Sequence, residues 1–487
     1  MAENTAPAYA TETTAINADE LAICLRVLEQ AAQLDKEHPD SVTVQRAVGH
    51  MFKKLKQRRR IEARDTVSEA DKAVIAATAT GSPNRIDDET AGIPISSSTT
   101  GVATAGTLLR ARPCYICKQK YTQVDAFYHQ LCPECAARSH GKRDARTDLT
   151  GKRALLTGGR AKIGMYIALR LLRDGAHTTV TTRFPNDAIR RFAAQPDSAD
   201  WLHRLRIVGI DLRDPAQVVA LADDVAAQGP LDILINNAAQ TVRRSPGAYS
   251  ALVEAESGPL PAGELPDVVT FGKTMQAHPT ALTASLTPSL TAADITDLAL
   301  VAGSATPERI SQGVAIDAGG LVPDLAHTNS WVQTVGEVDA TELLEVQLCN
   351  STAPFILISR LRPAMAAAAA PRKYVVNVSA MEGVFGRAYK GAGHPHTNMA
   401  KAALNMLTRT SAREMFEADG ILMTAVDTGW ITDERPHYTK VRLAEEGFHA
   451  PLDLVDGAAR VYDPIVRGEA GDDLYGCFLK DYEPSAW

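Results

Sequence analysis

The alternation of strand-like and helix-like segments between Leu149 and Trp487 constrains the fold more than any other feature of this chain. Short stretches rich in Val, Ile, Leu and Thr are separated there by amphipathic stretches of helical length. Parallel strands need crossover connections of this length, and the helices in them cover both faces of the sheet. The pattern therefore predicts an α/β fold with a doubly wound parallel sheet. An interruption at about residues 243–335, rich in Pro, Ser, Thr and Ala, predicts either an ordered subdomain over the site or a partly flexible lid.

Three further segments precede this fold. Residues 1–77 predict a helical N-terminal region, because apolar residues recur there every three or four positions. Residues 78–111 predict a linker, since a stretch dominated by Ser, Thr, Gly and Pro cannot bury enough apolar surface to offset the entropy of ordering. Residues 112–140 contain four of the seven cysteines and predict a small separate module.

Composition and charge exclude several classes of protein. The net charge of −7 does not indicate a protein that binds nucleic acid over its whole surface. The basic cluster Lys53–Arg60 has no interleaved aromatic residues, so we interpret it as a solvated helix end, with nucleic acid or an acidic partner as the alternative. No apolar run approaches the roughly 20 residues that cross a bilayer, and the N-terminus lacks a signal-peptide pattern. We therefore expect a cytoplasmic protein without membrane contacts.

The cysteine module contains two Cys-x-x-Cys pairs, Cys114 with Cys117 and Cys132 with Cys135. Two such turns at this separation suit Zn²⁺ held tetrahedrally by four thiolates. Four protein ligands leave no open position on the ion, so the predicted zinc is structural. A pair of redox disulfides is the alternative. We expect the module to dock the N-terminal region on the α/β domain or to bind a protein partner.

A glycine-rich turn connects the first strand of the α/β region with its first helix. It reads Thr157-Gly-Gly-Arg-Ala-Lys-Ile-Gly164, between the strand Arg153–Leu156 and the helix Met165–Asp174. In this context the loop amides and the helix N-terminus can face a pyrophosphate. The turn therefore predicts that the sheet is Rossmann-like and binds a dinucleotide.

Several motifs in this order resemble the short-chain dehydrogenase/reductase family over about residues 149–487, apart from the interruption. Besides the glycine turn, they are Asp211-Leu212, the strand Asp232-Ile-Leu-Ile-Asn-Asn-Ala-Ala239 and the segment Tyr374–Lys401. The resemblance implies that the first of these contacts the adenine ring and that the strand lines the cofactor. The family usually has glycine at Lys162. We expect the lysine either to hinder close approach of a phosphate or to place an ammonium group on it.

The end of the second strand decides between the two nicotinamide cofactors. A carboxylate there would hold a ribose 2′-hydroxyl, whereas Arg183, the residue present, suits a 2′-phosphate. Arg160 and Lys162 add positive charge nearby. We therefore predict NADP, with NAD as the alternative. The residues predicted to bind the dinucleotide are Thr157, Gly158, Gly159, Arg160, Lys162, Ile163, Gly164, Arg183, Asp211, Leu212, Asn237, Ala238, Ala239, Lys401, Gly429 and Thr432.

The resemblance is incomplete at the residues that carry the family's chemistry. In that family a Ser orients the substrate oxygen, a Tyr gives the proton, a Lys lowers the pKa of the Tyr, and an Asn completes a proton relay. Here Asn350 and Lys401 match the Asn and the Lys. Ala380 and Thr397 stand where the Ser and the Tyr would be. A threonine hydroxyl is too weakly acidic and too short to replace a phenol directly.

Another residue could supply the missing proton. His394 and His396 lie in the approach to the helix that contains Lys401, and imidazole titrates in the useful range. The candidate catalytic residues are Asn350, Lys401, Thr397 and His396. The segment Val426–Thr432 resembles the family's contact with the nicotinamide amide, although Thr432 comes one residue early.

Two functions follow from these residues. The first is an atypical NADP(H)-binding oxidoreductase that transfers hydride to or from a small carbonyl or alcohol. The second is a catalytically inactive dinucleotide-binding sensor or scaffold that binds partners through its zinc and helical modules. The resemblance implies a homodimer or homotetramer, and the sequence identifies no substrate.

Overall fold

The computed structural model describes most of the chain, and its residues divide into two compact units, Met1–Lys72 and Ala73–Trp487. The described residues are 16–83, 85, 104–244, 246–274, 320–321, 326–387, 390–431 and 434–487. No helix among them is long and apolar enough to cross a bilayer.

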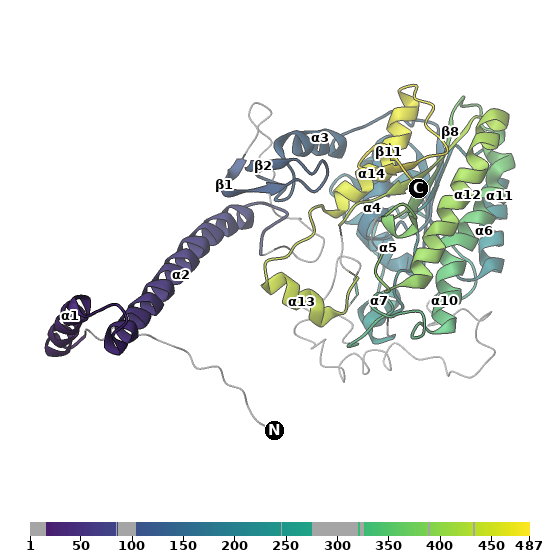
Figure 1. Ribbon diagram of the computed structural model, residues 1–487. Helices are drawn as coiled ribbons and strands as arrows, with labels where there is room; N and C mark the ends of the chain where they lie inside the picture. Colours follow the sequence, from purple (N-terminus) through teal and green to yellow (C-terminus); the bar gives the residue numbers. More distant parts are fainter. Residues whose placement is uncertain are drawn as a thin grey trace. The chain divides into compact units, whose positions relative to one another are not determined.

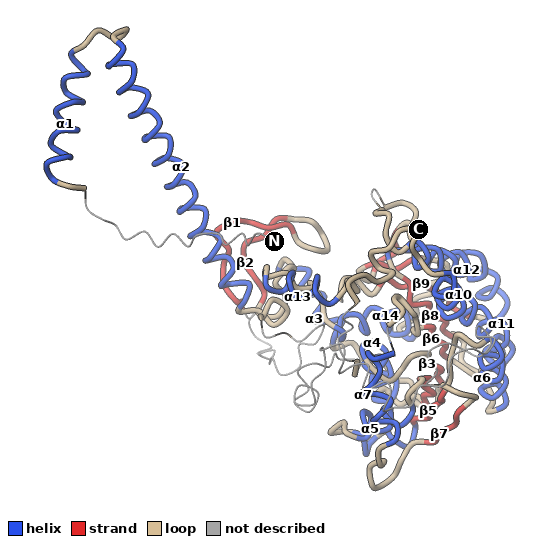
Figure 2. Tube along the Cα trace, turned by 90° about the horizontal axis from the view of Figure 1, so that it is seen from below, coloured by secondary structure: helices blue, strands red, loops and turns tan. Residues whose placement is uncertain are grey.

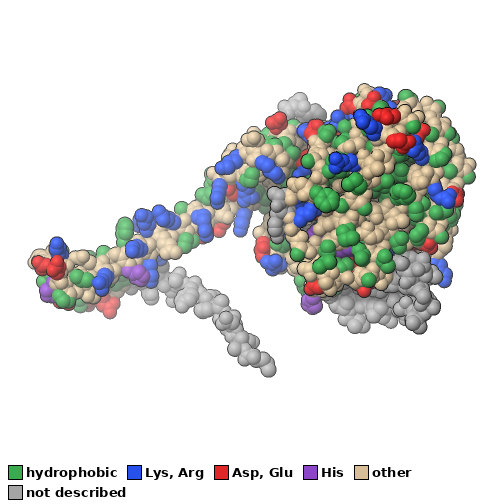
Figure 3. Space-filling model, turned by 45° about the vertical axis from the view of Figure 1, so that its right-hand side comes forward, with side chains coloured by type: hydrophobic (Ala, Val, Ile, Leu, Met, Phe, Trp, Pro, Cys, Tyr) green, Lys and Arg blue, Asp and Glu red, His purple; other side chains and the backbone are tan. Residues whose placement is uncertain are grey.

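The first unit contains helix α1, Ala18–Gln33, and most of helix α2, Pro39–Ala76. Asn17 begins α1 as a cap, because its side-chain oxygen accepts a hydrogen bond from the backbone N–H of Asp19 at 2.8 Å. Large apolar side chains stay exposed on both helices, among them Leu25 at 54% and Phe52 at 65%. Lys and Arg side chains gather along α2 (Figure 3), where the sequence has its basic cluster.

The second unit is built around one large sheet, shown in Figures 1 and 2. In the described residues its strands follow the order β11-β10-β9-β8-β6-β3-β4-β5-β7. All pairs are parallel except β10 with β11. This is the predicted Rossmann-like doubly wound sheet. The strands are β3 Arg153–Leu156, β4 His177–Thr182, β5 Leu205–Gly209, β6 Ile233–Asn236, β7 Asp267–Thr270, β8 Lys373–Ser379, β9 Ile421–Asp427, β10 Phe478–Lys480 and β11 Glu483–Ser485.

Apolar layers cover both faces of the sheet. Side chains of α4, α5 and α14 pack on one face, and those of α6, α11 and α12 pack on the other. β8 shows the strand alternation, since Val376 faces the first layer and Val375 the second. The helices are α4 Lys162–Arg173, α5 Pro185–Ala193, α6 Pro215–Ala227, α7 Ser250–Ser257, α10 Ala340–Gln347, α11 Ala353–Ala366, α12 Pro395–Asp419, α13 His437–Glu445 and α14 Leu454–Glu469.

The predicted interruption at 243–335 is partly ordered. It contributes α7 and the edge strand β7, whose Val268 pairs with Ile207 of β5. A later part, around Trp331, packs against the start of α12, where the rings of Trp331 and His394 stack with centroids 4.1 Å apart. Residues 275–319 and 322–325 lie outside the described residues.

The cysteine module is larger than the sequence predicts. It consists of the antiparallel strands β1, Thr104–Pro113, and β2, Lys120–Asp125, followed by helix α3, Pro133–Arg143. Regular structure therefore reaches into both ends of the predicted linker 78–111. Residues 104–111 pair with β2, and the backbone N–H of Thr80 donates to the carbonyl of Phe127 at 2.9 Å. Propensity failed here because tertiary pairing satisfies the backbone of a weakly apolar stretch.

Candidate functional site

A cavity of about 430 Å³ opens at the carboxyl ends of β3, β4, β5 and β6. Ligands of doubly wound sheets bind at this edge, where connections from neighbouring strands leave in opposite directions. The opposite wall comes from the chain between β9 and α14 through Ile431, Glu434 and Leu454. The other lining residues are Gly158, Arg160–Gly164, Thr181–Phe184, Ile210–Arg213, Asn237–Val242, Arg244, Tyr249, Leu321 and Cys349.

The glycine turn lies against its neighbours so closely that side chains would not fit. A Cβ atom on Gly164 would lie 1.9 Å from the carbonyl oxygen of Gly158, and one on Gly159 would lie 2.6 Å from Cβ of Val180. Gly158 also has a φ of 71°, which favours glycine. These glycines leave the backbone as the inner surface of the turn, which a phosphate-binding loop requires.

Lys162 begins α4 in a left-handed conformation, with a φ of 51°. Glycine adopts this conformation without strain, so the lysine carries a local cost of roughly 1–2 kcal/mol. The preceding N-cap, Ala161, makes no side-chain capping bond. The positive end of the α4 dipole also lies at this N-terminus, which suits an anion.

Thr157 and Asn237 hold the turn on the end of β6. The Asn237 side-chain amide donates to the carbonyl oxygens of Thr157 and Gly158, both at 3.0 Å. The Thr157 hydroxyl accepts from the backbone N–H groups of Asn237 and Ala238. The structure therefore places Thr157 behind the turn as a support, while Asn237 both supports the turn and lines the cavity with Ala238 and Ala239.

Arg183 follows β4 directly and lines the cavity. Its guanidinium lies over the ring of Tyr249 at 4.8 Å and near that of Phe184 at 5.5 Å. In the described part of the chain it forms no ion pair. By contrast, Arg160 is paired with Asp187. Arg183 therefore presents a positive charge that no carboxylate in the described ranges neutralises.

Asp211 and Leu212 line the cavity beyond β5, where an adenine contact was predicted. The carboxylate of Asp211 is engaged by Arg213 at 2.7 Å, and Arg213 also pairs with Glu345 of α10 at 3.2 Å. All three side chains are buried. Sequence reasoning missed Arg213 and Glu345, which fix the loop after β5 on α10.

Asn350 lies in a π-helical turn, Leu348–Thr352, between α10 and α11. Such turns often occur at functional sites, because they redirect side chains within a helix. The Asn350 side chain accepts from the backbone N–H of Gln240 at 2.7 Å and donates to its carbonyl at 2.9 Å. It thus anchors the segment that leaves β6 along the cavity.

Lys401 and Thr397 lie on the same face of α12, and both are buried. Lys401 donates to the carbonyl of Val378 at 2.8 Å, and Thr397 donates to the carbonyl of Thr241 at 3.3 Å. Burial lowers the pKa of Lys401 to about 8, although the nearby Cys349 and Glu382 act in the opposite direction. The described residues that line the cavity include neither side chain.

The two histidines before Lys401 have different environments. His394 caps α12 in a left-handed conformation, and its Nδ1 lies 2.8 Å from the carbonyl oxygen of Trp331. His396 is buried, its Nε2 lies 3.5 Å from the Thr397 hydroxyl, and its Nδ1 has no partner among the described residues. Burial lowers the pKa of His396. His394 therefore fastens the Trp331 segment, and only His396 adjoins Thr397.

Comparisons with known proteins agree with this geometry. A family model described as short chain dehydrogenase matches residues 152–254. An uncharacterized protein, R665, of Acanthamoeba polyphaga mimivirus is 32% identical over 368 residues, which are 73% of this chain and 71% of that protein. Residues 152–254 of this chain thus belong to the short-chain dehydrogenase/reductase family.

Two other similarities are weaker: one covers a smaller part of the chain, and the other has a lower sequence identity. A probable oxidoreductase of Streptomyces antibioticus is 42% identical over 94 residues, so the match spans 19% of this chain and 30% of that protein. NADPH-bound carbonyl reductase from chicken fatty liver is 18% identical, with a TM-score of 0.41, over 70% of this chain and 100% of that one.

The remaining residues predicted from the family resemblance are placed as follows. Gly429 has a φ of 78°, and a Cβ atom there would lie 2.6 Å from Leu452. Ala380 follows β8 and offers no polar side chain, whereas Ser379 donates to the Asn405 side chain on α12 at 2.5 Å. Thr432 lies outside the described residues.

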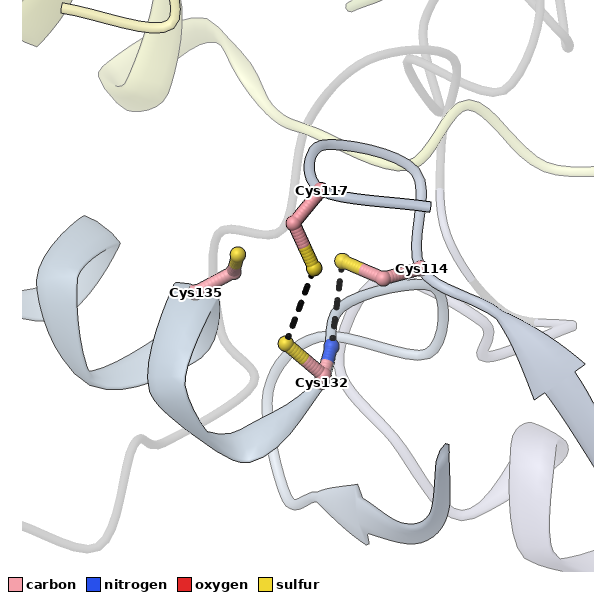
Figure 4. Close-up of side chains that lie close together, drawn as sticks. All are labelled: Cys114, Cys117, Cys132 and Cys135. Carbon is pink, nitrogen blue, oxygen red and sulfur yellow. Dashed lines mark hydrogen bonds between the residues drawn. The ribbon is translucent and has the colours of Figure 1, made fainter. Parts of the chain in front are cut away.

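The four predicted zinc ligands lie together, as Figure 4 shows. The sulfur atoms of Cys114, Cys117, Cys132 and Cys135 are all within 4.8 Å of one another. Cys114 directly follows β1, Cys117 lies in the tight turn after it, and Cys132 is the N-cap of α3. Tetrahedral thiolates about 2.3 Å from one Zn²⁺ would be separated by about 3.8 Å, so small side-chain movements would accommodate the ion.

Proposed function

We propose that this chain is an NADP(H)-binding oxidoreductase whose cofactor lies in the cavity beyond β3, β4, β5 and β6. The observation that carries the proposal is Arg183, a cavity-lining cation without an ion pair in the described residues, beside a turn that only glycines fit. A 2′-phosphate would give Arg183 an anionic partner, which the described residues do not provide. Among the described cavity-lining residues that follow β4, the first with a carboxylate is Asp211. Its oxygens are already engaged by Arg213, so it is not available to hold an NAD ribose.

The chemistry we propose is hydride transfer to or from a small carbonyl or alcohol, with NADP(H) supplying or accepting the hydride. Asn350 would hold the segment after β6 in place, and Lys401 would contact the cofactor ribose, as the family resemblance implies. The site is atypical because Ala380 and Thr397 offer neither an oxygen-orienting hydroxyl nor a phenol. The proton source we propose is His396, because it adjoins Thr397.

A second candidate is a dinucleotide-binding sensor or scaffold without turnover. A specific contact favours it. The hydroxyl of Thr397, which stands where the family's proton-donating Tyr would be, donates its hydrogen bond to the Thr241 carbonyl and not toward a substrate. In this case the cysteine module and the N-terminal helices would serve as surfaces for protein partners.

Two measurements on the purified full-length chain separate these candidates. Titration with NADPH and NADH tests cofactor binding, and we expect NADPH to bind at least about ten-fold more tightly, because a charge-assisted contact to the 2′-phosphate contributes about 1.5–3 kcal/mol. Equal affinities would contradict the NADP assignment. NADPH consumption is then followed with a wide panel of aldehydes and ketones.

The histidine variants complete this test. If His396 gives the proton, His396→Gln should lower turnover by about 10²–10⁴-fold, while His394→Gln should have little effect. Binding of NADPH without consumption in any assay would favour the sensor. Loss of turnover in both variants would indicate damage to the Trp331 contact instead of proton transfer.

We also propose a structural Zn²⁺ on the four cysteines. The donor set fits, because four thiolates from two tight turns converge and leave no position for a substrate. Metal analysis should find one Zn²⁺ for each chain. Cys135→Ser should lose it, whereas Cys24→Ser, an exposed cysteine outside the cluster, should retain it.

A further inference from the structure

The cysteine module contacts the chain that forms one wall of the cavity. The phenol oxygen of Tyr115, which lies inside the first Cys-x-x-Cys turn, accepts a hydrogen bond from the backbone N–H of Trp430 at 3.0 Å. Trp430 follows Gly429 at the end of β9. The next residue, Ile431, is 2% exposed and belongs to the same apolar cluster as Cys114 and Cys132. The first Cys-x-x-Cys turn thus holds the start of the segment between β9 and α14.

The module also holds the far end of the same chain. Arg85 donates to the carbonyl oxygens of Ala450 and Leu452, both at 2.6 Å. Leu452 is fully buried in the apolar cluster that contains the cysteines. Arg143 of α3 pairs with the Asp453 carboxylate, the N-cap of α14, at 2.5 Å. Both ends of the 429–454 segment are therefore fixed by residues of the module or of the stretch that precedes it.

This segment is part of the cavity wall. Ile431, Glu434 and Leu454 line the cavity, and Glu434 pairs with Arg244 at 3.1 Å. Arg183 and Leu212 lie at the β4 and β5 end, so the segment borders the other half of the cavity. If an adenosine 2′-phosphate lies beside Arg183, the nicotinamide half of the cofactor lies toward the segment.

The position of Tyr115 depends on the turn that contains it. That turn is short, and the apolar core beneath it includes two of the four cysteines. Small cores of this kind take much of their order from the metal that joins their ends. A hydrogen bond from the turn to Trp430 would therefore transmit the presence or loss of the metal to the wall.

We propose that metal binding at the four cysteines positions the 429–454 wall through the Tyr115–Trp430 contact and thereby sets the affinity for the nicotinamide half of the dinucleotide. Tyr115 is on this account a positioning residue. The inference rests on the proposed cofactor site. It deepens that proposal, because zinc would then affect how tightly the cofactor binds. Zinc would take no part in the hydride or proton transfer.

The experiment compares two ligands on full-length protein. NADPH spans both halves of the cavity, whereas adenosine 2′,5′-bisphosphate reaches only the half beside Arg183. Dissociation constants are measured by calorimetry for the zinc-loaded chain, for the chelator-treated chain and for zinc-loaded Tyr115→Phe. Tyr121→Phe is the matched control, because Tyr121 donates to the His129 carbonyl at 2.8 Å within the module and loses the same kind of bond.

We expect Tyr115→Phe to keep its zinc and to bind NADPH about three- to ten-fold more weakly, as loss of one buried hydrogen bond implies. Chelation should weaken NADPH about five- to hundred-fold, the usual range of coupling between sites. Neither change should affect the bisphosphate by more than about two-fold, and Tyr121→Phe should match the unaltered chain.

The other outcomes overturn the inference in distinguishable ways. NADPH affinity that is equal in all four proteins would overturn the coupling and leave the cofactor site standing. Equal weakening of both ligands, or equal weakening in Tyr121→Phe, would mean that the module only stabilises the fold. Failure of both ligands to bind the zinc-loaded chain would overturn the proposed function itself.

Discussion

Arg183 on one side of the cavity presents to it a cation that has no ion pair among the described residues, whereas two polar side chains of α12 on the other side bond to the chain itself. Lys401 bonds to Val378, and Thr397 bonds to Thr241. Under the proposed function, the Arg183 side of the cavity binds an anion, whereas Lys401 and Thr397 are engaged in bonds within the chain. The contrast teaches that the two halves of such a site need not be kept together.

The strongest test of this contrast is Gly164→Ala. The new Cβ would lie 1.9 Å from the Gly158 carbonyl oxygen, so the turn must move away from the phosphates. We expect a loss of NADPH affinity of at least about 100-fold and a destabilisation of about 1–3 kcal/mol. Calorimetric titration and thermal unfolding measure both. In the control Gly141→Ala, on α3, the new methyl meets nothing within 4 Å, and binding should not change.

Arg183→Ala should have the next largest effect. Removing the cation is expected to weaken NADPH by about ten- to hundred-fold and to leave NADH nearly unchanged, because only NADPH has the 2′-phosphate. Arg173→Ala, which breaks an exposed pair with Asp197, is the control. If NADH weakens as much as NADPH, the stacking of Arg183 on Tyr249 is structural and the anion-binding edge lies elsewhere.

A pH titration tests whether α12 still takes part in binding. The pKa of Lys401 is lowered to about 8 by burial, so its ammonium is present below that pH and is lost as pH rises through it. If the ammonium contacts the cofactor, NADPH affinity should fall by about ten-fold between pH 7 and pH 9. Lys401→Met should bind weakly at both pH values, while Arg183→Ala should keep the slope. If the NADPH affinity of the unaltered chain does not change with pH, Lys401 does not contact the cofactor and only supports the chain internally.

Thr397→Val should have the smallest effect. It leaves the Thr241 carbonyl without its donor, which costs about 1 kcal/mol in the free energy of unfolding, and it should leave NADPH affinity unchanged. Thr397→Ser keeps the hydroxyl and should restore stability. Should Thr397→Val lower a measured turnover by more than ten-fold, the hydroxyl would be part of the chemistry.

The sequence predicts the α/β architecture well because strand and helix periods are local properties. The glycine turn is likewise readable, since its φ angles and close approaches demand glycine at Gly158 and Gly164. Composition does not reveal the strand Thr104–Pro113 within the predicted linker 78–111, because this strand gains its stability from pairing with β2.

Side-chain partners were the least predictable part of the site. Tyr115 and Trp430 are separated by 315 positions, and nothing in a Cys-x-x-Cys motif specifies what its middle residues touch. His394 and His396 look equivalent in sequence, yet one stacks on Trp331 and the other is buried beside Thr397. Such differences depend on how distant segments approach one another, which periodicity does not encode.

The anchoring of Arg85 also bears on how the chain responds to proteases. Residue 85 is tied to Leu452, and Thr104 begins a strand paired with β2, so the stretch 86–103 joins two fixed ends of one body. A single cut within it would yield two fragments that migrate separately after denaturation but elute together under native conditions. Limited digestion could thus cut this chain while its N-terminal fragment stays bound through the Arg85 contacts.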